Sequence, residues 1–281
     1  VAALSNSSKF WYDRGGFRSK VISKIKTGQV HFKYNGNAEN LKKFIKDNEH
    51  RLIESTNSIS QRMKKRGGGV SKIKLVNKSL ELKSYYQLHV EFKTIDSMGA
   101  NFINSCLEII SKNFKEFLND SSEFKESEKK IEIIMSILSN YTPECIVESS
   151  VECKVNDLGN IDGMSAKEFA LKFKDAFDIA NVDISRAVTH NKGIMNGIDA
   201  VLISTGNDFR AVEAGIHAFA SDKGKYTSLS KCTMTDNIFK INLKIPLSIG
   251  TVGGVTDIHP MVKLSLKMLE NPTSDDLMNI I

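Results

Sequence analysis

The densest group of polar side chains suited to chemistry lies between Arg186 and Gly197. Within it, Lys192 stands between an asparagine and a glycine, in a stretch rich in turn-forming residues. Asp208 closes a Thr-Gly-Asn-Asp sequence at the expected start of a helix. A lysine that reaches into a cleft beside a carboxylate stays charged and can stabilise a developing oxyanion. Because Asn and Asp are also ordinary turn and cap residues, a surface loop followed by a capped helix is the alternative interpretation.

A second candidate site is the segment Asp-Ser-Met-Gly-Ala-Asn at residues 96–101. We expect Asp96 to cap a helix that opens with small residues, and the free N–H groups of a helix N-terminus suit a pyrophosphate. Small side chains would let a dinucleotide approach the backbone, and the Asp96 carboxylate could accept hydrogen bonds from a ribose. The alternative is structural: Asp96 only caps the helix, and Gly99 only allows tight packing.

Other candidate motifs are absent or have structural interpretations. No GxGxxG follows an expected strand and no GxxxxGK[ST] occurs, so Rossmann and P-loop nucleotide sites have no support. We expect His190 to orient its own segment through a hydrogen bond, and His217 to be structural. The glycines 67–69 follow three basic residues, but a helix-to-strand turn is favoured over a phosphate site.

The elements that must position these residues fall into two expected units. Val30, Phe32 and Tyr34 alternate with polar residues, which is the period-2 pattern of a half-buried strand. A helix at 37–56, strands at 73–76 and 80–94, a helix opening at 96 and a strand at 131–138 are predicted to follow. The order β-α-β-β-α-β is the ferredoxin-like motif, in which helices cover one face of an antiparallel sheet.

Residues 1–28 and 141–281 are expected to form a larger domain into which this smaller unit, 29–140, is inserted. Here the patterns predict strands at 145–155, 201–204 and 243–247, and helices at 165–179, 207–220 and 261–269. The fold class is therefore α+β: a large domain of mixed helices and strands with an inserted ferredoxin-like (βαββαβ) small domain.

Composition narrows the function classes. The 39 basic and 33 acidic residues leave a scattered net charge of +6, which suits an acidic small molecule. Nucleic-acid binding would need a basic stripe with interleaved aromatics, so we expect no nucleic-acid partner. No apolar run approaches the roughly 18 residues that span a bilayer, so we expect no membrane segment.

The four cysteines form neither CxxC pairs nor zinc spacings, and no secretory signal opens the chain. We therefore expect no metal, and a cytoplasmic location.

Three long motifs in the same order resemble the class II hydroxymethylglutaryl-CoA reductases. They are residues 96–101, the string Thr-His-Asn-Lys-Gly-Ile-Met-Asn-Gly at 189–197 with Thr-Gly-Asn-Asp at 205–208, and Val-Gly-Gly at 252–254. The likeness runs almost from end to end of the chain. It implies that the small domain binds NADH or NADPH and that the large domain binds substrate and coenzyme A.

The implied reaction interconverts 3-hydroxy-3-methylglutaryl-CoA with mevalonate plus coenzyme A by two hydride transfers. It belongs to the mevalonate pathway of isoprenoid biosynthesis. The resemblance also implies a homodimer or higher oligomer with a shared active site. Neither the choice between NADH and NADPH nor the physiological direction follows from the residues: Asp96 would repel a 2′-phosphate, and Lys93 would offset that repulsion.

The resemblance also implies roles for individual residues. Lys192 matches the catalytic lysine that stabilises the oxygen of the thioester and then of mevaldehyde, and Asp208 matches its aspartate partner. Arg186 and Asn196 match residues that hold the acyl substrate. The residues that match the dinucleotide site are Asp96, Met98, Gly99, Asn101 and, beside the nicotinamide, Asn140.

Two catalytic groups of the family have no counterpart in these 281 residues. The acidic proton donor would precede Val1, and the histidine that protonates the departing thiolate would follow Ile281 in a mobile flap domain. A lysine alone cannot deliver the proton that the alkoxide needs. We therefore expect a fragment that does not turn over by itself. The alternative is a catalytically incomplete relative that acts as a binding or assembly partner.

Overall fold

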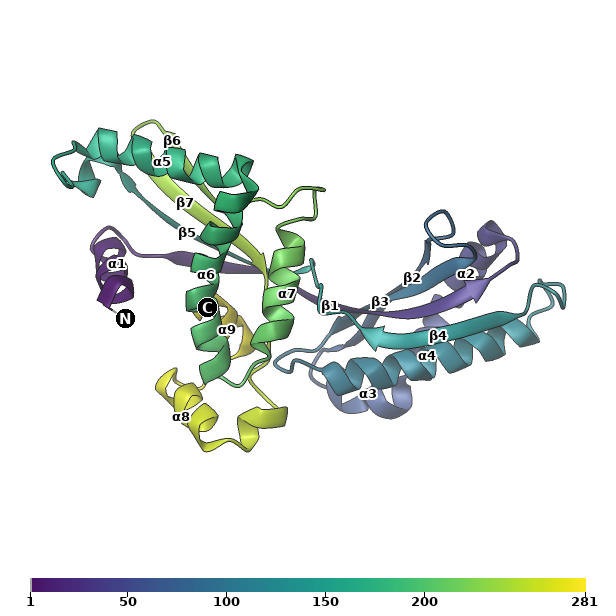
Figure 1. Cartoon of the computed structure of the whole chain (residues 1–281). Coiled ribbons are helices and arrows are strands. Elements are labelled where there is room, and N and C mark those ends of the chain that lie inside the picture. The colour runs from purple at the N-terminus through teal and green to yellow at the C-terminus, as the bar shows by residue number, and fades with distance from the viewer. Residues whose placement is uncertain (1) are drawn as a thin grey trace. The chain divides into compact units, whose positions relative to one another are not determined.

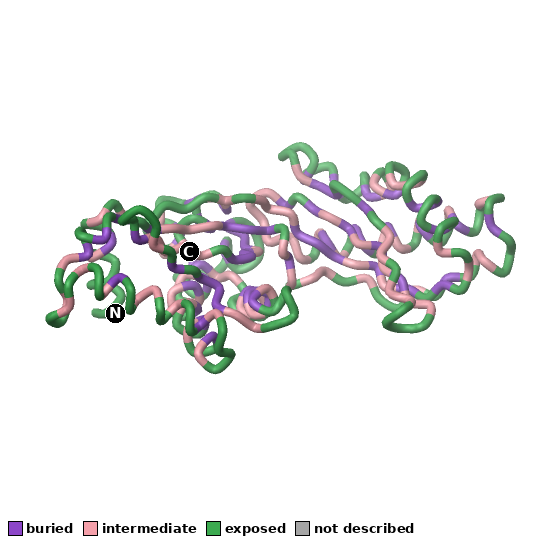
Figure 2. The backbone as a smooth tube through the Cα atoms, turned by 90° about the horizontal axis from the view of Figure 1, so that it is seen from above, coloured by how far each residue is buried: buried purple, intermediate pink, exposed green. Residues whose placement is uncertain are grey.

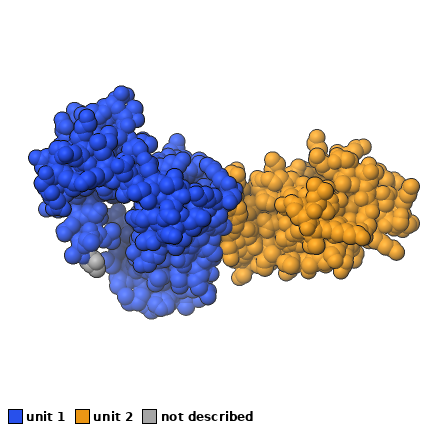
Figure 3. Space-filling model, turned by 45° about the horizontal axis from the view of Figure 1, so that its top comes forward, with its two compact units in different colours: residues 1–23, 145–281 blue, residues 24–144 orange. Residues whose placement is uncertain are grey.

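The structure is a computed structural model that describes residues 2–281 (Figure 1). It divides into two compact units (Figure 3): unit 1 takes in Val1–Ser23 and Cys145–Ile281, and unit 2 is Lys24–Glu144. These divisions lie close to the expected domain boundaries, 28/29 and 140/141. Val1, the first residue of the expected large domain, lies outside the described residues. Within residues 2–281, no helix combines the length and apolar character that crossing a membrane requires.

Unit 2 has the predicted ferredoxin-like order of elements. They are β1 (Arg18–Tyr34, which begins in unit 1), α2 (Ala38–Ser55), α3 (Asn57–Lys64), β2 (Gly69–Asn77), β3 (Tyr85–Lys93), α4 (Ala100–Asp120) and β4 (Ile131–Leu138). The strands pair antiparallel in the order β2-β3-β1-β4. The sequence-based prediction of a β-α-β-β-α-β unit is therefore confirmed, with one additional short helix, α3, after α2.

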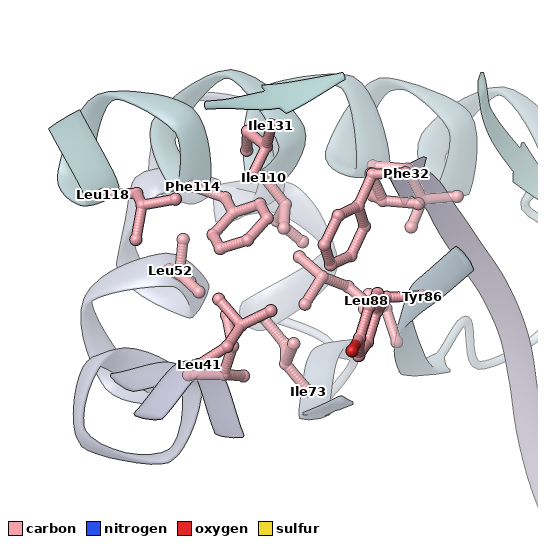
Figure 4. Close-up of a cluster of buried hydrophobic side chains, with 14 of the residues drawn as sticks. Phe32, Leu41, Leu52, Ile73, Tyr86, Leu88, Ile110, Phe114, Leu118 and Ile131 are labelled. Carbon is pink, nitrogen blue, oxygen red and sulfur yellow. The ribbon is translucent and has the colours of Figure 1, made fainter. Parts of the chain in front are cut away.

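Alternation along the central strands explains why this sheet forms. The even-numbered residues of β1 from Lys26 to Tyr34 and those of β3 are buried, whereas most of the odd-numbered residues there are not, so one face of the sheet is covered. Figure 2 shows where the backbone is buried. Helices α2 and α4 cover that face with Leu41, Leu52 and Ile110 among their buried residues. The ring of Phe32 on β1 meets Phe114 of α4 edge-on, with centroids 5.2 Å apart (Figure 4).

Two elements of unit 2 show how well the sequence predicts where helices and strands begin. The helix expected at 37–56 is confirmed, because the Asn37 side chain caps α2 by accepting the N–H groups of Glu39 and Asn40 at 2.9 and 3.0 Å. The strand expected from residue 80 was placed too early, since β3 begins at Tyr85. Leu80 is 99% exposed in the preceding turn, so burial does not hold it in a strand.

Unit 1 combines helices with the strands β5, β7 and β6, which pair antiparallel in that order. Its elements are α1 (Ala2–Tyr12), β5 (Cys145–Lys154), the 3₁₀ turn η1 (Val155–Leu158), α5 (Ala166–Val182), α6 (Ile184–Ser204), α7 (Phe209–Phe219), β6 (Ser230–Thr235), β7 (Ile238–Pro246), η2 (Gly254–Asp257), α8 (Pro260–Met268) and α9 (Ser274–Ile280). Trp11 of α1 stacks on Phe239 of β7 at 6.1 Å, so the N-terminal helix packs within this unit.

Helix α6 overturns two sequence-based expectations. The strand predicted at 201–204 is wrong, because these residues are the last turn of α6, and the turn-rich segment expected around Lys192 is helical throughout. Asp183 caps the helix by accepting the N–H of Arg186 at 2.7 Å. Met195, Ile198 and Leu202 recur at helical spacing and are buried in the core of unit 1. Their burial outweighs the low helix propensity of the glycines in the segment.

Candidate functional site

Helix α4 begins later than the sequence suggests. Its N-cap is Gly99, with φ +81° and no side-chain cap, and the first helical residue is Ala100. The expectation that Asp96 caps the helix is therefore wrong. The half-buried Asp96 lies in the loop that leads into α4. A positive φ costs little free energy only for glycine, so Gly99 can adopt the backbone conformation of this N-cap.

Reciprocal hydrogen bonds close the loop 94–99 on itself. Thr94 Oγ1 donates to Ser97 O at 2.7 Å, Ser97 Oγ donates to Thr94 O at 3.0 Å, and Ser97 N also donates to Thr94 O at 3.0 Å. A Cβ on Gly99 would lie 2.6 Å from Thr94 Cγ2, so the glycine allows this close approach. Three hydrogen bonds between Thr94 and Ser97 therefore hold the first part of the loop.

Strand β1 holds both segments that the resemblance assigns to the dinucleotide. Lys26 is only 4% exposed, and its Nζ donates to Ser97 O at 2.8 Å and Met98 O at 3.1 Å. The next residue, Thr27, accepts the N–H of Ser139 at 2.9 Å. Asn140 is exposed directly after Ser139. The structure thus brings the loop before α4 and the turn around Asn140 to adjacent residues of one strand.

The start of α4 has the donor chemistry that a pyrophosphate requires. Its first turn carries no acidic side chain, and Gly99 supplies no side-chain cap for the N–H groups there. Asn101 is exposed on this first turn. Unpaired N–H groups and the positive end of the helix dipole favour a bound anion. The residues at the start of α4 therefore fit the diphosphate of a dinucleotide.

In unit 1, Lys192 and Asn196 share one exposed face of α6. They are four residues apart, which places them on neighbouring turns of the same side. Arg186 lies in the first turn and is half-buried, about a third of a turn away from that face around the helix axis. The Lys192 side chain is exposed, so this chain by itself does not place it in a cleft beside a carboxylate.

A buried asparagine anchors Lys192 to the rest of unit 1. Asn191 is fully buried; its Oδ1 accepts the N–H of Leu229 at 3.0 Å, and its Nδ2 donates to Thr227 O at 2.9 Å. These bonds tie α6 to the segment before β6 and fix the rotation of the helix. The neighbouring Lys192 must then point outward.

The same arrangement recurs at Asp208. Asn207 Oδ1 accepts the N–H of Gly250 at 2.9 Å, and its Nδ2 donates to Thr205 Oγ1 at 3.1 Å. Asp208 is exposed and caps α7, with Oδ1 accepting the N–H of Ala211 at 3.2 Å. The predicted helix cap is therefore confirmed, and within residues 2–281 no ion pair joins Asp208 to Lys192. Arg210 Nε lies 3.7 Å from the same Asp208 oxygen.

The remaining histidine and glycine candidates have structural contacts. His190 Nε2 lies 2.7 Å from Ser230 Oγ, and its ring meets Phe177 edge-on. Burial, and next the charge of Arg186, lowers the pKa of His190. His217 Nδ1 lies 2.7 Å from Tyr226 Oη. Gly67 and Gly68 lie in the turn between α3 and β2, and Gly69 begins β2, so the expected helix-to-strand turn is present.

The cysteines pack within the cores. The four buried residues are Cys106 in unit 2 and Cys145, Cys153 and Cys232 in unit 1. Burial raises the pKa of Cys106 to about 12 and that of Cys232 to about 11, so both stay protonated near neutral pH. Across residues 2–281, no cluster of three or more His, Cys, Asp or Glu side chains could hold a metal ion.

Sequence reasoning missed three anchoring residues, Lys26, Asn191 and Asn207. A signal for Lys26 was present, because the period-2 pattern of β1 puts it on the same face as buried Val30 and Phe32. A lysine in register with an apolar face needs partners. The asparagines carry no comparable signal, since the same residue type serves equally in exposed turns.

Comparisons with known proteins were made over the whole chain. The sequence pattern of the hydroxymethylglutaryl-coenzyme A reductase family matches residues 1–281. The 3-hydroxy-3-methylglutaryl-coenzyme A reductase of Archaeoglobus fulgidus is 29% identical over 281 residues, which are 100% of this chain and 60% of that protein. The probable 3-hydroxy-3-methylglutaryl-coenzyme A reductase of Borreliella burgdorferi is 30% identical over 283 residues, which cover 100% of this chain and 61% of that protein.

The solved structures that resemble this chain are also 3-hydroxy-3-methylglutaryl-coenzyme A reductases. The reductase of Streptococcus pneumoniae superposes with a TM-score of 0.90 at 33% identity, covering 100% of this chain and 73% of that one. A class II structure from the same organism, bound to NADPH in open conformations, gives the same TM-score and identity over 99% of this chain. The chain spans about 60% of the length of the curated relatives it matches. By the match of the family pattern over residues 1–281, this chain belongs to the hydroxymethylglutaryl-coenzyme A reductase family.

Proposed function

We propose that the complete protein catalyses the reaction of its family. One 3-hydroxy-3-methylglutaryl-CoA, two NAD(P)H and two protons give mevalonate, coenzyme A and two NAD(P)⁺, or the reaction runs in reverse. The observation that carries this proposal is the match of the family pattern over residues 1–281, which includes both the loop before α4 and the segment around Lys192. Because the chain spans about 60% of its curated relatives, the activity is proposed for the complete protein.

The proposed dinucleotide site is the loop before α4, with Asp96, Met98, Gly99 and Asn101, together with Asn140. Two observations support this site. The first turn of α4 has no side-chain cap, and the loop before α4 and the turn around Asn140 are hydrogen-bonded to the adjacent β1 residues Lys26 and Thr27. When bound, a reduced nicotinamide supplies the hydrides of the reaction. A solved relative from Streptococcus pneumoniae is bound to NADPH, which makes NADPH the first cofactor to test.

Lys192 is the proposed catalytic group of unit 1. Its exposed ammonium is available to a substrate carbonyl, whose oxygen becomes negatively charged as hydride adds to the carbon. A fixed cation at that oxygen stabilises the transition state more than the ground state. Asp208 is proposed to act beside Lys192 in the assembled enzyme, since its second carboxylate oxygen is not used by the α7 cap.

Arg186 and Asn196 are proposed to hold the acyl substrate. Asn196 shares the exposed face of α6 with Lys192, so one ligand could contact both side chains. Arg186 is the cation nearest the start of the helix and would pair with the free carboxylate of the acyl group. Neutral Asn196 can donate to a carbonyl or hydroxyl without altering the local charge.

The proposal also includes an oligomeric state and a location in a reducing compartment. The family resemblance implies a homodimer with a shared active site, and exposed Lys192 and Asp208 are compatible with a site that a partner subunit completes. The four buried cysteines pack in the cores without any disulfide among residues 2–281, which suits the cytoplasm.

The direct test is oxidation of NADPH or NADH by the complete protein with the acyl-CoA present. We expect oxidation that requires the acyl-CoA and releases free thiol and mevalonate. Tight binding of acyl-CoA and dinucleotide without any turnover would instead identify a catalytically incomplete relative. Absence of dinucleotide binding would overturn the proposed function itself.

A further inference from the structure

We infer that Lys26 is a positioning residue for the dinucleotide, which it serves by orienting two main-chain N–H groups. This inference rests on the proposed function of the loop before α4. It concerns unit 2 alone, where Lys26 of β1 donates to Ser97 O at 2.8 Å and to Met98 O at 3.1 Å.

The burial of Lys26 makes this contact strong. The side chain is only 4% exposed, and an ammonium removed from water must have hydrogen-bond acceptors. Two consecutive carbonyl oxygens supply them. Hydrogen bonds from a charged donor are shorter and stronger than neutral ones, so the two carbonyls are held firmly in direction.

Peptide geometry carries this constraint to the opposite side of the loop. The structure contains no cis peptide bond among residues 2–281. In a trans peptide the C=O and N–H groups of one plane point in opposite directions. The Ser97 carbonyl shares its plane with the N–H of Met98, and the Met98 carbonyl shares its plane with the N–H of Gly99. Both N–H groups therefore point away from the ammonium.

These two N–H groups continue the row of donors at the start of α4. Neither the N–H of Met98 nor that of Gly99 has an acceptor among the described residues. Consecutive main-chain N–H groups that lead into a helix form a concave anion site. Lys26 thus fixes the donors for a diphosphate without touching it, and its charge lies behind the loop.

Neighbouring contacts alone hold only one of the two peptide planes, because Thr94 Oγ1 also donates to Ser97 O. The hydrogen bonds between Thr94 and Ser97 close the loop, but none of them engages the Met98 carbonyl. Glycine at 99 adds conformational freedom at the next position. Without the Lys26 ammonium, rotation of the peptide plane between Met98 and Gly99 would turn a carbonyl towards the phosphate.

The test measures dinucleotide and acyl-CoA binding separately in the complete protein carrying Lys26→Met. We expect the Kd for NADPH to rise at least about ten-fold, and the Kd for the acyl-CoA to stay within about two-fold. Bound NADPH should protect the Met98 and Gly99 amides from hydrogen exchange in the unsubstituted protein and protect them less in Lys26→Met. The KM for the dinucleotide should rise more than kcat falls, because a lost positioning group can be offset by saturation.

The matched control is Lys33→Met, on the same strand and on its opposite, exposed face. It should bind both ligands as the unchanged protein does. Lys26→Gln retains a neutral NH₂ donor group and carries the test if Lys26→Met does not fold. We expect its Kd for NADPH to rise at least about three-fold. Unchanged NADPH binding in a folded Lys26 variant would overturn this inference. Failure of the unsubstituted protein to bind any dinucleotide would overturn the proposed function instead.

Discussion

The side chain of Asn191 accepts a hydrogen bond from the main-chain N–H of Leu229 at 3.0 Å, in the core of unit 1. Asn191 is fully buried and immediately precedes Lys192. The anchor and the proposed catalytic group are therefore neighbours in sequence, and one fixes the direction of the other. The same pairing occurs at Asn207 and Asp208, where the asparagine bonds Gly250 and the acid is exposed.

Replacing Asn191 by Ala should impair both stability and activity. It leaves the N–H of Leu229 and the carbonyl of Thr227 without their partner, which costs about 1–3 kcal/mol of unfolding free energy. Turnover should fall further than stability alone explains, because α6 can rotate and move Lys192. Urea unfolding and steady-state kinetics of the complete protein measure the two effects.

Thr189→Ala is the control for this prediction, since it removes an exposed hydroxyl that bonds only within α6. Its unfolding free energy should change by less than about 0.5 kcal/mol. An Asn191→Ala protein with unchanged stability and turnover would show that the anchor has no role in the site.

Gly99 and Gly67 form a matched pair for the loop before α4. Both have a left-handed φ, +81° and +84°, but only at Gly99 would a Cβ meet an atom within 3 Å, Thr94 Cγ2 at 2.6 Å. Gly67→Ala should therefore cost about 1 kcal/mol of unfolding free energy from backbone strain. Gly99→Ala should cost at least about 2 kcal/mol, from strain and overpacking together.

Only Gly99→Ala should also weaken NADPH binding, because the loop before α4 must shift to admit the methyl group. Chemical denaturation and a fluorescence titration of both proteins provide the comparison. Equal losses of stability and of NADPH affinity at the two glycines would contradict the proposed site.

Asp208 allows the helix cap to be separated from the carboxylate charge. Asn is as good an N-cap as Asp, so Asp208→Asn should keep the α7 cap to Ala211 and the stability. Asp208→Ala should lose about 1 kcal/mol of unfolding free energy. Both variants should lose most of the turnover, because both lack the charge. Full activity in Asp208→Asn would leave Asp208 with only its structural role.

Stability should fall in acid because of His190. Burial, then Arg186, lowers the pKa of His190 below its ordinary value of 6.5, so the unfolded chain takes up the proton first. The contribution of the neutral ring is complete above pH 6.5 and is lost as pH falls below 6.5 towards the folded-state pKa. His190→Gln should reduce the difference in unfolding free energy between about pH 7.5 and about pH 5.5.

The effect should be partial, because burial also lowers the pKa of His31 and of His89 in unit 2. Urea titrations at the two pH values measure it, with Thr189→Ala as a variant on the same helix that removes no titratable group. If His190→Gln keeps the whole pH dependence, His190 is not part of it.

The sequence predicted unit 2 well because its signals are local. Alternation in β1 and β3 indicates both strands within a few residues, although β3 begins at Tyr85 and not at residue 80. The helix expected at 37–56 is α2. The family resemblance specified the site residues, whose roles stay predictions.

The errors arose where tertiary burial outweighs local propensity. Two glycines and turn-forming residues around Lys192 suggested a loop, yet the buried stripe of Met195, Ile198 and Leu202 makes the segment helical. Asp96 is a good capping residue by type, but the Thr94–Ser97 hydrogen bonds and the contacts of Lys26 move the cap to Gly99.

The most direct test of the central claim is the turnover of the complete protein with Lys192→Ala, beside Lys167→Ala, which removes an exposed lysine on α5. The account predicts that kcat with the acyl-CoA falls at least about a hundred-fold in Lys192→Ala, with NADPH binding retained. Lys167→Ala should turn over normally. Turnover of Lys192→Ala within about three-fold of the unsubstituted protein would contradict the assignment of the ammonium to the reacting oxygen.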